Sequence, residues 1–301
     1  KPVAILLIIT LIVSGVSYQR WSQELSSALR GVAGGNAAES NESGSARHKL
    51  DYIETSGNDI VLGYNGEKLI FTTYPDDPAA VSIFDSRGSA VTAAPTEDSS
   101  VFQIDDERYG WISVKPARDS DGNNYIVLMT DGHEWPFQIT EGGPKYFTGL
   151  GGLIDLKQIE SIGFENNGSW GNGRGYIWSR SFPMIKDTLI LGNGADTYCI
   201  YFPHDDYAGK YNSGSYSDNI NIIVDKPHNM YIGMAINTGV ISLLALLALW
   251  GIYIVQSFMI YRRERYDRFI SYVGSGIFLG ISGFLAAGMV NDSSVSVMPM
   301  F

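Results

Sequence analysis

Cysteine and positive charge are scarce in this sequence. Cys199 is the single cysteine among 301 residues, so no disulfide can form within the chain and a folded domain must rely on its core. With 21 Lys and Arg against 32 Asp and Glu, the net charge is −11. This balance lacks the basic footprint of nucleic-acid-binding proteins, and we predict no nucleic-acid partner.

Metal-binding patterns are also missing from the sequence. Only four histidines are present, and none has the HExxH or i, i+4 partner that a zinc site on a helix requires. His204 precedes Asp205 and Asp206 in "PHDDY", which leaves a cation site open as an alternative, although adjacent loop residues rarely converge on one ion. We therefore predict neither a metal nor a cofactor.

Charge is absent from three long segments, Pro2–Tyr18, 232–260 and 269–290. A helix needs ~20 apolar residues to cross a hydrocarbon core of ~30 Å, and the second and third segments reach that length. The first is near the lower limit, and a secretory signal peptide is the alternative there. The predicted transmembrane helices are 1–19, 231–261 and 268–291.

The orientation of these helices follows from the basic residues. "YRRERYDR" at 261–268 places four arginines in the short link between the last two helices. Positively charged loops stay on the cytoplasmic side, so 262–267 is predicted to be a cytoplasmic loop and the large region before it to be extracytoplasmic. Binding of anionic lipid is an alternative role for these arginines, and both roles are compatible.

The two ends of the sequence look like cut points. The chain starts at Lys1 rather than at Met, and it stops at "SVSVMPMF" without a polar tail. We expect a fragment of a longer multi-pass protein, in which residues 292–301 begin a further extracytoplasmic or membrane segment.

The extracytoplasmic region divides by composition. Residues 20–48 include a run of Gly, Ala, Ser and Asn with few large apolar side chains, and they are predicted to be a linker. Between 49 and 150, short apolar or alternating runs recur, and Asn65-Gly66 separates two of them as in a tight hairpin. We predict a β-rich insert that forms an antiparallel sandwich or barrel.

Residues 151–230 follow a different pattern. In "RGYIWSRSFPMIKDTLI", interrupted by Pro183, the apolar residues at helical spacing are Ile177, Trp178, Phe182, Ile185 and Leu189. The segment is too short and too charged to cross a bilayer, so we predict an interfacial helix at the outer membrane surface. A Gly-x-Gly turn and an aromatic stretch follow in "LGNGADTYCIYFP".

The position of His228 is defined by its neighbours. It follows Pro227, and helix-compatible sequence begins just after it, so His228 is predicted to lie at the outer mouth of the second membrane helix. Two roles suit this position: contact with water and lipid headgroups, or catalysis by an imidazole that titrates near neutral pH.

Basic side chains are expected on the same surface, namely Arg174, Arg180, Lys210 and Lys226. A lipid phosphate or diphosphate would explain them, because a guanidinium matches phosphate oxygens with two parallel hydrogen bonds. Snorkelling to headgroups is the alternative. Arg174 and Arg180 lie about 120° apart on a straight helix, so one phosphate faces only one of them. We rank Arg174 first, because Trp178 one turn later can anchor that face.

These motifs, taken in order, resemble the signature region of the O-antigen ligase and polymerase family between residues 170 and 260. The pattern is Arg174 with Trp178, then Leu191-Gly192-Asn193-Gly194, then His228-Asn229, then a Gly239-Val240 step inside a membrane helix. Typical members lack the β-rich insert, so the resemblance implies nothing about its role.

The resemblance implies a glycosyltransferase of the bacterial plasma membrane. Such an enzyme moves a glycan from a polyprenyl diphosphate carrier to a hydroxyl of a glycan or lipid acceptor at the outer face, with inversion and without a metal. It implies His228 and Arg174 as catalytic residues, acting on the acceptor proton and on the diphosphate. The residues expected to contact substrate are Arg180, Lys226, Lys210, Asn229, Trp178, Gly192 and Gly194. As a C-terminal-half fragment, the chain would be inactive by itself.

A second class of function stays open. A membrane-anchored sensor or receptor would use the β-rich insert to bind an extracellular ligand, and an adapter would use it to hold a partner. Within the transferase hypothesis, Trp111 and Trp135 either bind glycan or pack inside the insert. The predicted fold class is the same for all of these functions: a membrane protein of mixed class, with transmembrane α-helices, a β-rich insert and an interfacial helix.

Overall fold

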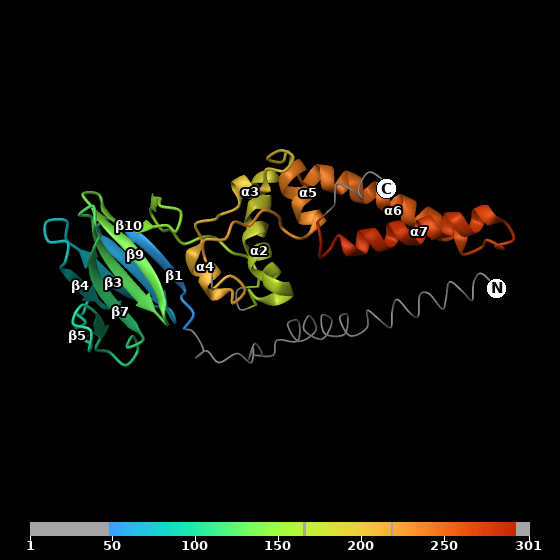
Figure 1. Ribbon diagram of the computed structural model, residues 1–301. Coiled ribbons are helices and arrows are strands. Elements are labelled where there is room, and N and C mark those ends of the chain that lie inside the picture. The colour runs from blue at the N-terminus through green and yellow to red at the C-terminus, as the bar shows by residue number, and fades with distance from the viewer. Residues whose placement is uncertain (1–47, 165–166, 218, 293–301) are drawn as a thin grey trace.

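The computed structural model describes residues 48–164, 167–217 and 219–292. The predicted first transmembrane helix (1–19), the predicted linker up to residue 47 and the C-terminal residues 293–301 lie outside them. A β-rich part, a compact helical part and a long helical hairpin follow one another along the described chain (Figure 1).

Two antiparallel sheets build the β-rich part of the described chain, and within each sheet the strands pair in the order of the sequence (Figure 1). The first sheet contains β1 (Tyr52–Ser56), β2 (Asp59–Tyr64), β3 (Glu67–Thr73) and β4 (Val81–Phe84). The second contains β5 (Ala93–Pro95), β6 (Phe102–Ile104), β7 (Ile112–Arg118), β8 (Asn124–Thr130), β9 (His133–Thr140), β10 (Gly143–Phe147) and β11 (Leu153–Ile154).

The strands form where the sequence alternates, because successive side chains of a strand point to opposite faces of a sheet. The predicted hairpin at Asn65-Gly66 joins β2 to β3, with φ of 52° and 75° at the two turn residues. Buried side chains of both sheets form one core, which includes Ile60, Leu62, Leu69, Phe71, Ile112, Val114, Ile126, Leu128, Trp135 and Phe137.

The tryptophans of the β-rich part take different positions. Trp135 is fully buried and its Nε1 lies 2.8 Å from Oγ1 of Thr130, so the packing interpretation is confirmed for this residue. Trp111 is partly buried and stacks on the His48 ring, with centroids 4.3 Å apart. A contact with glycan is therefore available to Trp111 alone of the two.

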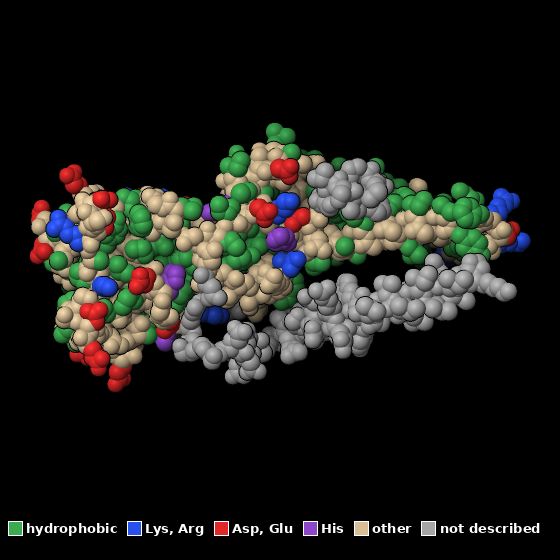
Figure 2. All heavy atoms as spheres, in the orientation of Figure 1, with side chains coloured by type: hydrophobic (Ala, Val, Ile, Leu, Met, Phe, Trp, Pro, Cys, Tyr) green, Lys and Arg blue, Asp and Glu red, His purple; other side chains and the backbone are tan. Residues whose placement is uncertain are grey.

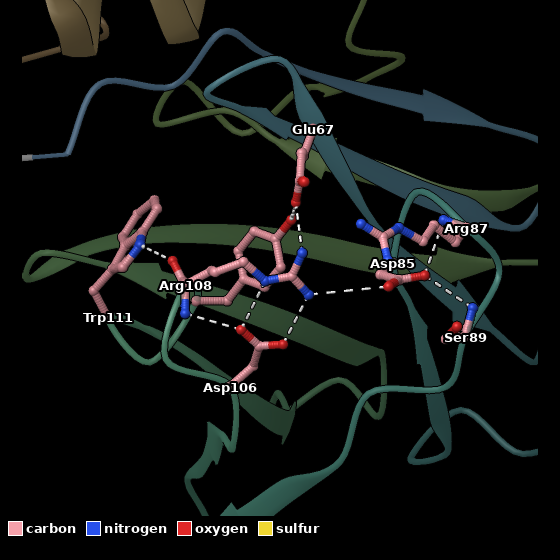
Figure 3. A network of polar contacts seen from close by, with 8 residues as sticks. Glu67, Asp85, Arg87, Ser89, Asp106, Arg108 and Trp111 are labelled. Atoms are coloured by element: carbon pink, nitrogen blue, oxygen red, sulfur yellow. Dashed lines mark hydrogen bonds and ion pairs between the residues drawn. The ribbon is translucent and has the colours of Figure 1, made fainter.

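An arginine ties the two sheets together at one end (Figure 3). Nη1 of Arg108 lies 2.7 Å from Glu67 of β3, and Nη2 lies 2.9 Å from Asp106 in the loop between β6 and β7. Asp85 is further away, at 3.9 Å. The hydrogen bonds from Arg108 lower the pKa of the Asp106 carboxyl. Glu67 and Asp106 thus hold a cation of the protein itself.

The helical elements follow the sheets in the chain. They are α2 (Trp170–Met184), the 3-10 helix η1 (Ile185–Thr188), α3 (Tyr198–Tyr201), α4 (Tyr207–Asn212), α5 (Met230–Thr238), α6 (Val240–Tyr261) and α7 (Phe269–Ala287). A second core lies among α2, α3 and α5, and its buried members are Tyr176, Ile177, Trp178, Tyr198, Phe202, Val224, Ile232 and Ile236.

Helix α4 attaches the β-rich part to the helical part. Tyr207 packs against Tyr146 of β10 with ring centroids 4.7 Å apart. The side-chain amide of Asn212 bonds both backbone groups of Leu50, accepting from its N at 2.9 Å and donating to its O. Because α4 belongs to the first core, the insert is packed onto the helical part rather than joined to it by chain alone.

The predicted interfacial helix is present as α2, but its apolar side chains face protein. Ile177 and Trp178 are buried in the second core, and Phe182 and Ile185 pack against it. The predicted placement of this face on the membrane surface is therefore wrong for these residues. Helical spacing identifies an apolar face and does not distinguish a protein partner from lipid.

The range predicted as one helix, 231–261, contains two helices. Gly239 separates α5 from α6 with a φ of 97°, and a Cβ at this position would overlap the carbonyl oxygen of Ile190. Continuous hydropathy hid the break, because glycine also occurs within membrane helices. His228 consequently precedes the short helix α5 and not the long apolar helix.

Among the described residues, α6 and α7 are long and apolar enough to cross a membrane. Their 22 and 19 residues correspond to about 33 and about 28 Å at the helical rise, close to the ~30 Å hydrocarbon core. The two helices run antiparallel, and their basic link lies at the end far from α5 (Figures 1 and 2).

Candidate functional site

The C-terminal end of α7 meets the starts of α2 and α5. The last carbonyls and the first N–H groups of a helix lack partners within it. Here the two helix ends satisfy each other, because N of Met230 lies 2.8 Å from O of Gly288 and 3.0 Å from O of Asn291. We call this meeting point, formed by residues 285–292 against 171–174 and 228–231, the α7 junction.

Asn229 is the N-cap of α5 at the α7 junction. Its Oδ1 accepts hydrogen bonds from N of Tyr231 and N of Ile232, both at 3.0 Å, as capping residues do. Its Nδ2 donates to O of Met289 at 2.7 Å. Asn229 was predicted to contact substrate, and in the structure both ends of its amide are bound to backbone.

His228 lies immediately before this cap. Its φ is 50°, a left-handed conformation that is uncommon for a residue other than glycine. Nδ1 of His228 lies 3.0 Å from Oδ2 of Asp292, and both side chains are partly exposed. A carboxylate at Nδ1 favours the tautomer with its proton there, which leaves Nε2 able to accept a proton.

Arg174 contacts the same end of α7. Its Nε donates to O of Val290 at 3.0 Å and its Nη1 donates to O of Gly171 at 2.6 Å. A guanidinium has five N–H groups, and the other three donate no hydrogen bond to any residue that the structure describes. Arg174 is thus fixed in place by backbone carbonyls and keeps donors for an anion.

The sequence explains why Arg174 begins a regular helix. Residues Gly171, Asn172 and Gly173 have φ of 60°, 61° and 86°, so the chain turns sharply before helical geometry starts at Arg174. A Cβ at Gly173 would overlap the ring of Tyr216. Burial raises the pKa of Tyr216, while the nearby Arg174 opposes that shift.

Trp178 connects the helix of Arg174 to the loop of His228. It lies one turn beyond Arg174 on α2, and its Nε1 donates to O of Pro227 at 2.7 Å. Its ring packs against Trp170, with centroids 5.2 Å apart. This hydrogen bond holds Pro227, the residue just before His228, so Trp178 helps to position the histidine.

Lys226 is the other basic residue near the α7 junction, and its side chain is exposed. Figure 2 shows basic, acidic and histidine side chains gathered over the middle of the molecule, where α2 and α5 lie.

Arg180 lies away from the α7 junction, on the side of α2 that faces α4. Its Nε is 2.6 Å from Oδ2 of Asp206, with side chains 14% and 6% exposed. Asp206 also caps α4 by accepting from N of Gly209 at 3.0 Å. Arg180 therefore has a counter-charge of its own, and the structure does not bring it together with Arg174 and His228.

Lys210 is also engaged within the protein. Its Nζ donates to O of His204 and to O of Ile222, both at 2.8 Å, and the side chain is 1% exposed. Burial lowers the pKa of Lys210 to about 8. His204 was considered with Asp205 and Asp206 as an alternative cation site. In the structure, Nε2 of His204 lies 2.7 Å from O of Cys199.

Gly192 and Gly194 lie against the C-terminal end of α5. The N of Gly194 donates to O of Asn237 at 2.9 Å. A Cβ at Gly192 would overlap the backbone of Asn237 and Thr238, and Gly194 has a φ of 118°. Both glycines permit the loop to approach the break at Gly239, which is a packing role for residues predicted to bind substrate.

Asp292 is the main site residue that sequence reasoning missed. It follows α7 in "GMVNDSS", and nothing local marks it as a partner of His228. The available signal was a carboxylate directly after an uncharged span, at the level where the other charged residues were expected. Tyr216, which packs on Gly173 beside Arg174, was missed as well.

The α7 junction thus combines a base and a cation. His228, oriented by Asp292, can take a proton, and Arg174 can stabilise developing negative charge through preorganised donors. These are the requirements of group transfer from a phosphate ester to a hydroxyl.

Part of the chain that includes this region matches a known family. Residues 144–247 match the family model described as O-antigen ligase. The matched segment begins in β10, contains Arg174 and His228, and ends within α6, while strands β1 to β9 lie before it. No curated protein and no solved structure matches the chain.

Proposed function

We propose, from the match of residues 144–247 to the O-antigen ligase family model, that the chain transfers a glycan from a polyprenyl diphosphate carrier to an acceptor hydroxyl at the outer face of the plasma membrane. The family is integral to the membrane and acts on lipid-linked glycans, and the helices α6 and α7 agree with that setting.

One observation carries the assignment to specific residues. Arg174 and His228 are far apart in the chain, yet both contact the residues that directly follow α7, through Val290 and Asp292. A diphosphate beside Arg174 would therefore lie close to a base, as the reaction requires.

The proposed proton path starts at the acceptor. Nε2 of His228 takes the hydroxyl proton while the oxygen attacks the anomeric carbon of the donor glycan. The bond from that carbon to the diphosphate oxygen breaks, and the diphosphate leaves with the electron pair. Asp292 stabilises the imidazolium that forms. General-base assistance of this kind contributes ~10²–10⁴ in rate.

The leaving diphosphate gains negative charge, and the guanidinium of Arg174 binds the diphosphate and stabilises this charge. Arg174 has N–H groups that donate to no described residue, and Gly171 and Val290 hold its side chain in place, so little reorganisation is needed. The N-terminal end of the regular helix in α2 adds a favourable dipole, and Lys226 supplies an exposed positive charge two residues before His228.

The proposed sidedness follows from the helical hairpin. The arginine-rich link between α6 and α7 is predicted to stay in the cytoplasm, and the α7 junction lies at the other end of both helices (Figure 1). The junction, α4 and the β-rich part would then all be extracytoplasmic, at the level where a carrier's phosphates lie.

The direct test uses His228→Ala and Arg174→Lys in the full-length protein, with lipid-linked donor and glycan product measured in membranes. Loss of transfer in His228→Ala at normal abundance supports the base. Arg174→Lys keeps the charge and removes the planar fork, and we expect a fall of ~10²–10³ in rate.

Matched controls exist in the β-rich part. His48 pairs with Asp131 through Nδ1 at 3.0 Å, as His228 does with Asp292, and Arg118 donates from Nε to O of Gly122 at 3.1 Å. His48→Ala and Arg118→Lys should leave transfer unchanged. Product at the wild-type level from His228→Ala would refute the mechanism.

A further inference from the structure

An exposed apolar tip lies beside the start of α6. It contains Leu189, Ile190 and Leu191 after η1, together with Ile200 and Tyr201 of α3, and all five side chains are exposed. No charged residue occurs between Asp187 and Asp196, or in α3 itself. Figure 2 shows hydrophobic side chains projecting from this edge of the molecule, near α3 and α5 in Figure 1.

The apolar tip is fixed to the beginning of the membrane-compatible helix. N of Ile241 donates to O of Leu189 at 3.3 Å, and Gly239 lies against the backbone of Ile190 and Gly192. Ile241 is itself exposed, so the apolar surface of the tip continues onto the exposed face of α6. The tip therefore lies at the depth where α6 would enter the bilayer.

Its two halves are also joined to each other. Oγ1 of Thr197, at the start of α3, donates to O of Gly194 at 2.8 Å, and N of Asn193 donates to O of Ile236 at 3.0 Å. The segment between the two halves of the tip is thus hydrogen-bonded to the start of α3 and to α5. Tyr201 at its edge has the amphipathic ring that favours the headgroup level.

We propose that the apolar tip inserts into the outer leaflet of the lipid bilayer and sets the depth of the α7 junction. Isolated soluble surfaces rarely expose such a contiguous patch, and continuity with α6 points to lipid as the occupant. The tip contacts the C-terminal end of α5, and His228 precedes its first residue. At the helical rise, nine residues place the tip and the histidine about 13 Å apart along α5.

This anchor differs from the one predicted from sequence. The spacing suggested that α2 rests on the membrane, whereas Ile177 and Trp178 are buried. Lipid contact is assigned instead to the loop that follows η1 and to α3. Insertion to ~5–10 Å is typical of interfacial apolar surfaces.

Depth-dependent quenching tests the proposal independently of activity. In full-length protein, Cys199 and any cysteine outside residues 1–301 are replaced by serine, and Leu191→Cys is labelled with a fluorophore. The labelled protein is reconstituted in phosphatidylcholine–phosphatidylglycerol vesicles with brominated acyl chains. Leu150→Cys is the matched control, because Leu150 in the loop after β10 and Leu191 are both 78% exposed.

We expect quenching by brominated lipid to be at least about threefold stronger at Leu191 than at Leu150, with the reverse order for aqueous iodide. Equal quenching at the two positions would overturn the proposal. So would a label at Leu191 that neither quencher reaches, because protein would then cover the tip. Ile200→Cys provides a second position if the first variant does not fold, and the same pattern is expected there.

Discussion

Nε1 of Trp178 donates a hydrogen bond to the carbonyl oxygen of Pro227, 2.7 Å away, and so links α2 to the residue before His228. The same helix presents Arg174 one turn earlier. A single indole therefore fixes the relative position of the proposed base and the proposed cation.

Trp178→Phe should lower transfer while preserving most of the packing. The ring still fills the second core, but the loop of His228 loses its anchor, and small displacements of a catalytic group are costly in rate. We expect turnover to fall by about tenfold with stability reduced by about 1 kcal/mol. Transfer assays and thermal unfolding measure the two effects.

Trp135→Phe is the matched control for this change. Trp135 is buried and its Nε1 also makes one hydrogen bond, to Thr130 at 2.8 Å, but it lies in the β-rich part. A similar loss of stability with unchanged turnover is expected. If turnover relative to the wild type is the same in Trp178→Phe and Trp135→Phe, the Trp178 hydrogen bond is only structural.

Asp292→Asn tests the orientation of His228. The amide cannot stabilise an imidazolium and does not select the tautomer with its proton on Nδ1. We expect kcat to fall by about 10- to 100-fold with the KM for donor nearly unchanged, and the pH profile of kcat to shift. Asp131→Asn, at the corresponding pair with His48, should change neither quantity. A loss of activity that comes only from a higher KM, with kcat unchanged, would contradict the positioning role.

Local sequence patterns predicted the elements whose cause is local. Asn65-Gly66 has the left-handed turn residues that close a hairpin, and the uncharged runs gave α6 and α7 because hydropathy alone decides them. The break at Gly239 was not predictable in this way. It arises because the loop of Gly192 packs closely against it, and that contact comes from elsewhere in the chain.

In the candidate site too, the sequence indicated the residues that belong to local motifs and not their long-range partners. Motif order identified Arg174 and His228, but the partner Asp292 and the hydrogen bond at Val290 are long-range contacts that no spacing encodes. Arg180 shows that a residue expected at the site can instead be bound elsewhere in the protein. The sequence ranked it behind Arg174 and still predicted that it contacts substrate, but its role depends on Asp206, a residue that tertiary packing brings to 2.6 Å.

Asp206→Asn should destabilise the fold strongly. Arg180 and Asp206 are mostly buried, so removal of the negative charge leaves a guanidinium without a counter-charge in a low-dielectric environment. Loss of one partner of a buried pair typically costs about 3–5 kcal/mol in the free energy of unfolding. Chemical denaturation in detergent would measure the change.

The control for this prediction is an exposed ion pair. Lys186 contacts Glu160 with side chains 58% and 61% exposed, and Glu160→Gln should change the free energy of unfolding by less than about 1 kcal/mol. Replacement of both buried partners, as Arg180→Met with Asp206→Leu, should recover part of the lost stability. Equal effects of Asp206→Asn and Glu160→Gln would argue against a buried, tightly coupled pair.

Lys210 predicts how stability depends on pH. Burial lowers its pKa to about 8, while a lysine in the unfolded chain titrates near about 10.4. Between these values the unfolded state binds a proton that the folded state has lost, so this residue makes stability rise with pH from about 8 to about 10.

Lys210→Met removes the titration of this buried lysine. Lys49→Met replaces an exposed lysine and is the control that leaves the titration of Lys210 in place. The free energy of unfolding of the wild type, taken relative to Lys210→Met, should increase by up to about 3 kcal/mol across this window. Parallel stability curves for the two proteins from pH 7.5 to 10 would contradict the buried, depressed lysine.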